Sequence, residues 1–122
     1  MSPGPADPIV VAVVVTHVGH GEMLSDCIAS VLDAGGISAL IIVDNSPGSV
    51  AIRTVADVGN DATEVVVVEN RGFGAAVNAG IQAAGHCAVS EADDSVEFYA
   101  VLNDDVTVEP GWLTFLMDKT TT

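Results

Sequence analysis

Four short apolar runs, each followed by turn-forming residues, divide the sequence into repeating units. The run from Ile9 to Val15 is continuous and rich in β-branched residues. This pattern is typical of a strand covered on both faces, as in a parallel sheet. Shorter runs of similar character cover Ala39 to Val43, Glu64 to Val68 and Val96 to Leu102. We predict a strand at each of the four positions.

Between these runs, apolar residues recur at the spacing of a helix. The first helix is predicted to end at Gly35-Gly36, a weaker second one near Gly59, and an alanine-rich third one at Gly85. Pro110 is suited to open a last short helix. We expect Phe73 and Trp112 to be core residues. The stripes are Leu24, Ile28, Val31 and Leu32; Ala51 and Val55; Phe73, Val77, Ile81 and Ala84; and Trp112, Leu113, Leu116 and Met117.

Strands that alternate with helices predict an α/β domain of three layers around a mainly parallel sheet. A chain of 122 residues is long enough for one modest core. Residues 9–118 are expected to form this domain, and residues 1–8, with three prolines, a flexible arm. The polar stretch at residues 86–95 is interpreted as a solvated loop.

Polar side chains follow all four predicted strands. In a parallel sheet the carboxyl ends of the strands meet at one edge, and the crevice beyond that edge is the usual ligand site. The polar strand ends are Thr16 and His17, Asp44 and Asn45, Asn70 and Arg71, and Asn103 to Asp105. Their convergence predicts a binding site at this edge.

The last of these strand ends, Asn103-Asp104-Asp105, carries two adjacent carboxylates and an amide. Oxygen ligands of this kind suit a hard divalent cation such as Mg²⁺ or Mn²⁺. The alternative is an ordinary turn, because Asp and Asn favour turns after strands. Two nucleotide motifs fit poorly. The stretch Gly72 to Val77 matches only the start of a dinucleotide fingerprint, and no phosphate loop ending in Gly-Lys is present.

The charge balance narrows the possible ligands. Seventeen acidic residues against three basic ones give a formal charge of −14, which argues against binding to nucleic acid or anionic lipid. An anionic diphosphate would need a cation between itself and such a chain. The simpler alternative is that the acidity only aids solubility or reflects a salt-rich cytoplasm.

The remaining chemistry-bearing residues have no obvious site. Cys27 and Cys87 lack metal-ligand spacing and are interpreted as buried free thiols. His17, His20 and His86 likewise show no ligand spacing. No apolar run approaches the roughly 20 residues that span a bilayer, and no secretory signal is recognisable at the N-terminus. We expect a cytoplasmic protein, peripheral to a membrane only through partners.

Four motifs in register resemble the inverting family 2 glycosyltransferases of the GT-A fold, especially their bacterial rhamnosyltransferase-like branch. The resemblance runs from about Val10 to Leu116. It rests on Val11 to Thr16, Val43 to Ser46, Asn70 to Gly74 with Asn78 to Ile81, and Leu102 to Val106. It implies a Rossmann-like domain that binds a nucleotide-diphospho-sugar, such as a UDP- or dTDP-sugar, for transfer to a glycan or lipid-linked acceptor hydroxyl in cell-wall or polysaccharide synthesis.

The resemblance also implies roles for individual residues. Thr16 would lie against the nucleoside, and Asp44 would hydrogen-bond the base or ribose. Arg71 would lie beside the base or diphosphate. Asp105 matches the third position of the family's D-x-D motif, the metal ligand, and Asn103 replaces the usual first aspartate. The other residues assigned to donor binding are Asn70, Asn78 and Asp104.

Each role has a structural alternative. Asp44 also suits a turn or a helix N-cap, Arg71 can pair with a local acid, and Asn78 can be a helix-packing amide. In the resembled family the catalytic base and acceptor pocket lie well downstream of the acidic turn, so the catalytic residues are unassigned. We expect the donor-binding half of an enzyme, either a fragment or a truncated relative.

Two other functions are alternatives for such a sequence. The first is a noncatalytic domain of the same fold that serves assembly or regulation, for example as a homo-oligomer. The second is a phosphoacceptor receiver domain. A receiver requires paired acids after the first strand and a lysine late in the sheet, whereas Thr16-His17 and a sheet without lysine stand here.

Overall fold

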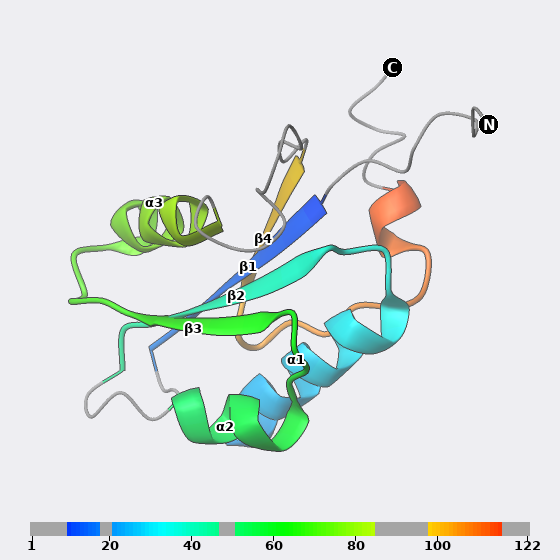
Figure 1. The fold of residues 1–122 in the computed structure, drawn as a ribbon, viewed down its shortest axis with the longest axis horizontal. Coiled ribbons are helices and arrows are strands. Elements are labelled where there is room, and N and C mark those ends of the chain that lie inside the picture. Colours follow the sequence, from blue (N-terminus) through cyan, green and yellow to red (C-terminus); the bar gives the residue numbers. More distant parts are fainter. Residues whose placement is uncertain (1–9, 18–20, 47–50, 85–97, 116–122) are drawn as a thin grey trace.

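A computed structural model describes residues 10–17, 21–46, 51–84 and 98–115. Strands and helices alternate along the chain (Figure 1). In chain order the elements are β1 (Val10–Thr16), α1 (Glu22–Ala34), β2 (Ala39–Asp44), α2 (Ala51–Val58), β3 (Thr63–Val67), α3 (Phe73–Ala84) and β4 (Phe98–Asn103).

The four strands form one sheet in the order β3-β2-β1-β4, and every pair is parallel. Helices α1 and α2 lie on one face of the sheet and α3 on the other (Figure 1). This division follows from the right-handedness of strand-helix-strand connections. The chain moves from β1 to β3 in one direction and then crosses back to β4, so α3 has to cover the opposite face. The predicted three-layer α/β fold is confirmed.

The core has two halves because β1 and β2 are buried on both faces along their whole length. Alternate residues of a strand point to opposite faces. Val11, Val13 and Val15 therefore pack with α3, whereas Ala12 and Val14 pack with α1 and α2. A strand without an exposed face needs apolar residues at every position, which explains the unbroken apolar run.

The element boundaries lie close to the predicted ones. β1 and β3 are each displaced by one residue from the prediction. Residues 112–115 form the described part of the last short helix, and Trp112 packs against the core on the α1 side, as expected. The predicted arm, the 86–95 loop, Gly85 and Cys87 lie outside the described residues. None of the described helices is long and apolar enough to cross a membrane.

The prediction that Phe73 belongs to the core is wrong. Its side chain is 46% exposed, and the buried residues of α3 are Ala76, Gly80 and Ala84. A Cβ atom on Gly80 would come within 2.6 Å of Val13 Cγ1. The helix therefore contacts the sheet through its small residues, and its larger apolar residues lie beside this contact.

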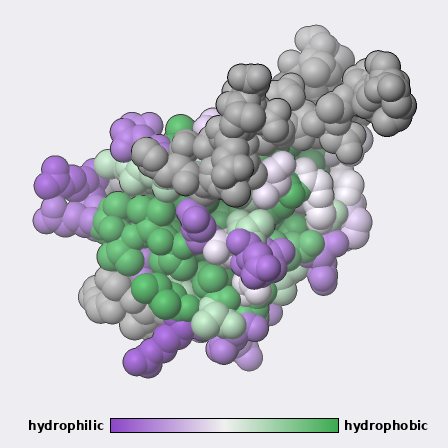
Figure 2. Space-filling model, in the orientation of Figure 1, coloured by the Kyte–Doolittle hydropathy of each residue, from purple (hydrophilic) through white to green (hydrophobic). Residues whose placement is uncertain are grey.

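One face of the molecule exposes apolar side chains. Figure 2 shows apolar residues gathered over β3, next to α2 and α3. Ile52 of α2 and Val67 of β3 are 58% and 48% exposed. β3 is an edge strand with only one neighbour, which explains why it is less buried than β1 and β2.

Candidate functional site

The candidate site lies at the carboxyl ends of β1, β2 and β4. The chain order reverses between β1 and β4, so their ends flank the topological switch point, where parallel α/β sheets usually bind ligands. In the sheet, Thr16 is paired with Asp44 and Val15 with Asn103. The acidic turn, defined as Asn103 to Asp105, therefore begins beside the last residues of β1.

A hydrogen bond joins the acidic turn to β1. The Thr16 hydroxyl donates to Asp104 Oδ2 at 2.6 Å. Thr16 is fully buried and Asp104 is half-buried, whereas Asn103 and Asp105 are exposed. Thr16 thus orients one carboxylate of the turn, and Asp105 is exposed to solvent.

Helix α1 contacts the acidic turn and the segment that follows it. The Cys27 thiol lies 3.8 Å from the Asn103 carbonyl, to which it donates, and the Val108 amide donates to Ser30 Oγ at 3.0 Å. Burial, and then the charges of Asp104 and Asp105, raise the pKa of the Cys27 thiol to about 12. Cys27 is buried and free, as predicted.

Asp44 is fully buried and makes hydrogen bonds within the chain through both carboxylate oxygens. Oδ1 accepts from the Ser46 amide at 2.8 Å and also from the Ser46 hydroxyl. Oδ2 accepts from the amide of Ala51, the first residue of α2, at 3.0 Å. This geometry is that of the turn and helix-capping role, the structural alternative predicted for Asp44 from the sequence.

Asn45 also lies at this edge, and the sequence alone indicated no individual role for it. Its backbone amide donates to the Thr16 carbonyl at 2.9 Å, and the residue is 8% exposed. Neither amide atom of its side chain has a hydrogen-bond partner in the structure as described. An unpaired buried polar group costs about 1–3 kcal/mol. Such an amide at a strand end is a candidate for binding a ligand.

The sequence alone could not identify Asn45 as the candidate ligand-binding residue. Two adjacent polar residues followed the strand, and the resemblance assigned the role to the first. Which of the two is used by the fold depends on the position of α2, because the Ala51 amide is the group that Asp44 caps.

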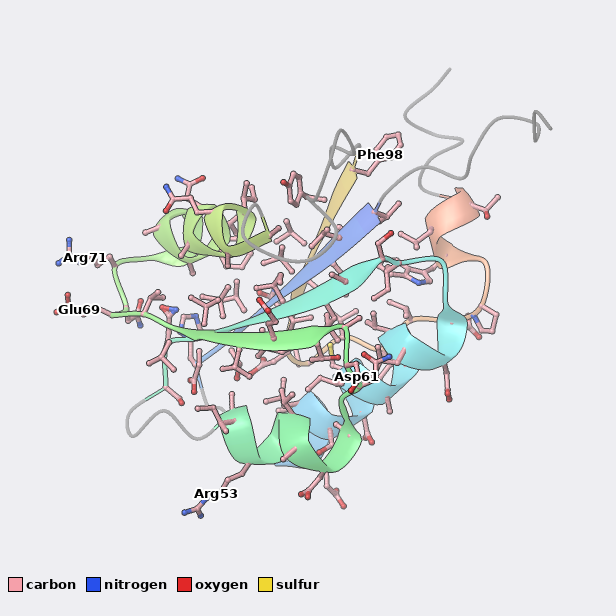
Figure 3. The ribbon with its side chains drawn as sticks, in the orientation of Figure 1. Arg53, Asp61, Glu69, Arg71 and Phe98 are labelled. Atoms are coloured by element: carbon pink, nitrogen blue, oxygen red, sulfur yellow. The ribbon has the colours of Figure 1, made fainter. Side chains whose placement is uncertain are left out.

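The residues after β3 are not brought together with the acidic turn. Arg71 pairs with Glu69 at 2.9 Å, and both side chains are 75% exposed. Figure 3 shows the pair at the margin of the molecule, on the connection between β3 and α3. Asn70 accepts a hydrogen bond from the Gly72 amide at 3.1 Å, and Asn78 is exposed on α3. β3 and β4 are three strand spacings apart, roughly 14 Å.

The acidic turn can hold a cation only together with other ligands. No group of three or more His, Cys, Asp or Glu side chains suited to a metal is found among the described residues. Asp104 and Asp105 offer carboxylate oxygens, which suit a hard cation that completes its shell with phosphate and water.

Comparison with known proteins gave one match. A sequence model of the family described as Glycosyl transferase family 2 matches residues 11–121. No curated protein and no solved structure matches the chain. The matched region includes the ends of all four strands and the acidic turn.

Proposed function

Because the chain belongs to glycosyl transferase family 2, we propose that the edge formed by Thr16, Asn45 and the acidic turn binds the nucleoside diphosphate of a sugar donor. The observation that carries the proposal is the unpaired, buried Asn45 amide beside Thr16 at the topological switch point. An amide side chain offers both donors and an acceptor, which complement the edge of a pyrimidine base or a ribose.

The donor is a UDP- or dTDP-sugar, and the sugar passes with inversion to a glycan or lipid-linked acceptor hydroxyl in cell-wall or polysaccharide synthesis, as in the rhamnosyltransferase-like branch. Asp44 fixes the turn that places Asn45, and Thr16 orients Asp104. Asn103 and Asp105, both exposed, are available to the sugar and the diphosphate. We assign no catalytic base to the described residues.

The cation in this proposal is Mg²⁺ or Mn²⁺, held by Asp105 with support from Asp104. When bound, it neutralises the diphosphate and stabilises the leaving group as a Lewis acid. The exposure of Asp105 and the oxygen chemistry of the turn fit such an ion. The charge of −14 makes this neutralisation necessary for an anionic donor.

We assign Arg71, Asn70 and Asn78 to the end of the donor that lies farther from the acidic turn. An exposed ion pair such as Arg71–Glu69 contributes at most about 1 kcal/mol. Breaking this ion pair therefore costs little, and it would leave Arg71 able to contact the base of the donor.

The test is calorimetric titration of the chain with UDP and dTDP, with and without Mn²⁺. We expect Mn²⁺ to strengthen binding of at least one nucleotide by about tenfold, which corresponds to roughly 1.4 kcal/mol. Asp105→Asn removes this increment, because the amide is a poor ligand for a hard cation. Asp57→Asn is the matched control, since Asp57 is an exposed acid on α2.

Asn45→Ala tests the second half of the site. It should weaken nucleotide binding with and without Mn²⁺, because it acts on the nucleoside rather than on the metal. The proposal fails if neither nucleotide binds at millimolar concentration in the presence of Mn²⁺.

A second candidate is a noncatalytic domain for assembly, with the nucleotide site unused. The exposed apolar residues over β3 favour it, because exposed apolar patches mark contact surfaces (Figure 2). Light scattering that shows a tight oligomer, together with absent nucleotide binding, would select this function.

A further inference from the structure

Strand β3 is an edge of the sheet with an outer side of unpaired backbone groups. Within the described residues it pairs with β2 alone, and Figure 1 shows it at the front of the molecule, between α3 and α2. The Val68 amide donates to the Asp44 carbonyl, towards β2. Successive residues of a strand direct their backbone groups to opposite sides. The amide and carbonyl groups of Val65 and Val67 therefore point away from the sheet.

The side chains at this edge on the α2 side are apolar and exposed. Val65 packs with the cluster between the sheet and α2, and Val67, two residues later, points to the same face. Val67 is 48% exposed, and Ile52, near the start of α2, is 58% exposed. Glu64, the charged residue of β3, points to the other face. Open backbone groups beside exposed apolar side chains form a template for pairing with another chain.

The exposed residues of α2 form one stripe that is complementary to itself. They are Ile52, Arg53, Ala56 and Asp57. Residues four positions apart are neighbours on a helix surface, so an apolar row lies beside a charged row. The charged row has its cation near the start of the helix and its carboxylate near the end. When two copies of α2 pack antiparallel, Arg53 of each copy lies beside Asp57 of the other.

A two-fold axis perpendicular to the sheet produces the strand contact and the helix contact together. It places β3 antiparallel to its copy and keeps the helices of both copies on the same face, so the two α2 helices lie side by side. α2 connects β2 to β3 and packs with residues of both, over the gap between them. The two α2 helices would be two strand spacings apart, roughly 10 Å. Packed helices are about 8–10 Å apart.

We propose that two copies of this chain form a two-fold dimer through β3 and α2, in which their sheets join into one. Val65, the middle residue of β3, pairs with Val65 of the second copy through backbone hydrogen bonds. The Ile52 and Val67 side chains become buried, and Arg53 pairs with Asp57 of the second copy. The candidate nucleotide site lies outside this surface, so dimerisation does not depend on sugar transfer.

The net charge of −14 on each copy opposes the dimer. Repulsion between remote carboxylates acts over a longer range than the contacts of α2, and salt screens it. We therefore expect the dimer to strengthen as NaCl rises from about 0.05 to 0.5 M, as measured by sedimentation equilibrium. A chain that stays monomeric at millimolar concentration in the higher salt would overturn the proposal.

Charge reversals test the antiparallel contact of the two α2 helices. Arg53→Glu and Asp57→Arg should each weaken the dimer about tenfold, because each replaces two attractive contacts by two repulsive ones. An equimolar mixture of the two variants should dimerise as well as the unchanged chain, since both contacts are attractive in the mixed dimer. A mixture that dimerises no better than its two components contradicts the proposed symmetry.

Asp33→Arg is the matched control for Asp57→Arg. Asp33 is an exposed acid on α1, and its reversal changes the net charge by the same amount. Because the net repulsion falls equally in both variants, Asp33→Arg should not weaken the dimer. Equal effects of the two reversals would show that net charge alone controls association, against the proposal.

Hydrogen exchange tests the strand contact. As the concentration of the chain rises, exchange of the Val65 and Val67 amides should slow, because the dimer gives them hydrogen bonds, whereas Val66 should change less. Val67→Lys places a charge on the edge and should weaken the dimer about tenfold or more. The exposure of Val67 lets the monomer tolerate this charge. Protection that rises with concentration in β4 instead would place the contact at the opposite edge and rule out this dimer.

Discussion

At the scale of single residues, the Asp44 carboxylate supports the end of β2 and the beginning of α2 together. One oxygen accepts from Ser46 and the other from Ala51, and the group is fully buried. Ser30 has a comparable position, since its hydroxyl donates to the Cys27 carbonyl and accepts from the Val108 amide. These side chains hold the loops of the candidate site in place.

Asp44→Ala is expected to destabilise the fold by about 2–3 kcal/mol, because it removes a cap and leaves buried donors unpaired. Asp44→Asn keeps one acceptor oxygen and should cost less. Urea unfolding measures both. Asp57→Ala, an exposed change on α2, should stay within about 0.5 kcal/mol. If Asp44→Ala left the stability unchanged but abolished nucleotide binding, Asp44 would instead act on the ligand.

The raised pKa of Cys27 predicts how the stability of the fold changes with pH. The thiol has a pKa of about 12 in the folded chain against the ordinary 9.0. Its contribution to stability is therefore complete below pH 9 and is lost as the pH rises from 9 through 12, since the unfolded thiol ionises first.

Native Cys27 should consequently resist iodoacetamide at pH 8 and react only on unfolding, as measured by peptide mapping. In Cys27→Ala, the loss of stability above pH 9 should be smaller than in the unchanged chain. Rapid alkylation of Cys27 in the folded chain would contradict the burial of this thiol.

At the scale of elements, α3 approaches the sheet through small residues. Gly80 lies against Val13 and Val43, where an added Cβ atom would come within 2.6 and 3.0 Å of their methyl groups. The close approach is what leaves Phe73 outside the core, and it determines which side of α3 faces solvent.

Gly80→Ala should destabilise the chain by about 1–3 kcal/mol, because α3 has to move away from two valines. Gly74→Ala on the same helix is the matched control, since no atom lies within 4 Å of its added Cβ. The control should gain up to about 1 kcal/mol from helix propensity. Thermal unfolding of both variants checks the pair, and equal gains would show that α3 is not in close contact with the sheet.

At the scale of the whole molecule, the charge of −14 acts against the compact state. The described basic side chains are few, and Arg71 pairs with Glu69 at the surface. Mutual repulsion of surface carboxylates lowers stability and is screened by salt. The same charge favours binding of the divalent cation proposed for the acidic turn.

Raising NaCl from about 0.05 to 0.5 M should raise the Tm by about 2–5 °C, which corresponds to roughly 1 kcal/mol. Differential scanning calorimetry measures this shift. The double variant Asp57→Asn, Asp61→Asn, with two exposed acids removed, should show a smaller rise. A Tm independent of salt would mean that repulsion among the carboxylates is negligible in the folded chain.

The sequence by itself determined the elements and the fold class. Apolar periodicity reports burial directly, so the continuous runs at β1 and β2 and the alternation with helices predicted a parallel three-layer domain. The strand-end positions of Thr16 and Asp105 followed from the same pattern.

Only the tertiary structure decided which polar groups are already satisfied and which are not. Asp44 and Asn45 are adjacent polar residues in the sequence. In the fold, the Asp44 carboxylate accepts a hydrogen bond from the Ala51 amide of α2, whereas the Asn45 side-chain amide is unpaired. The sequence likewise could not separate Arg71 from Asp105, because the distance between their strands depends on the order β3-β2-β1-β4. Long-range pairing of this kind is not encoded in local periodicity, and for that reason the site depended on the assembled sheet.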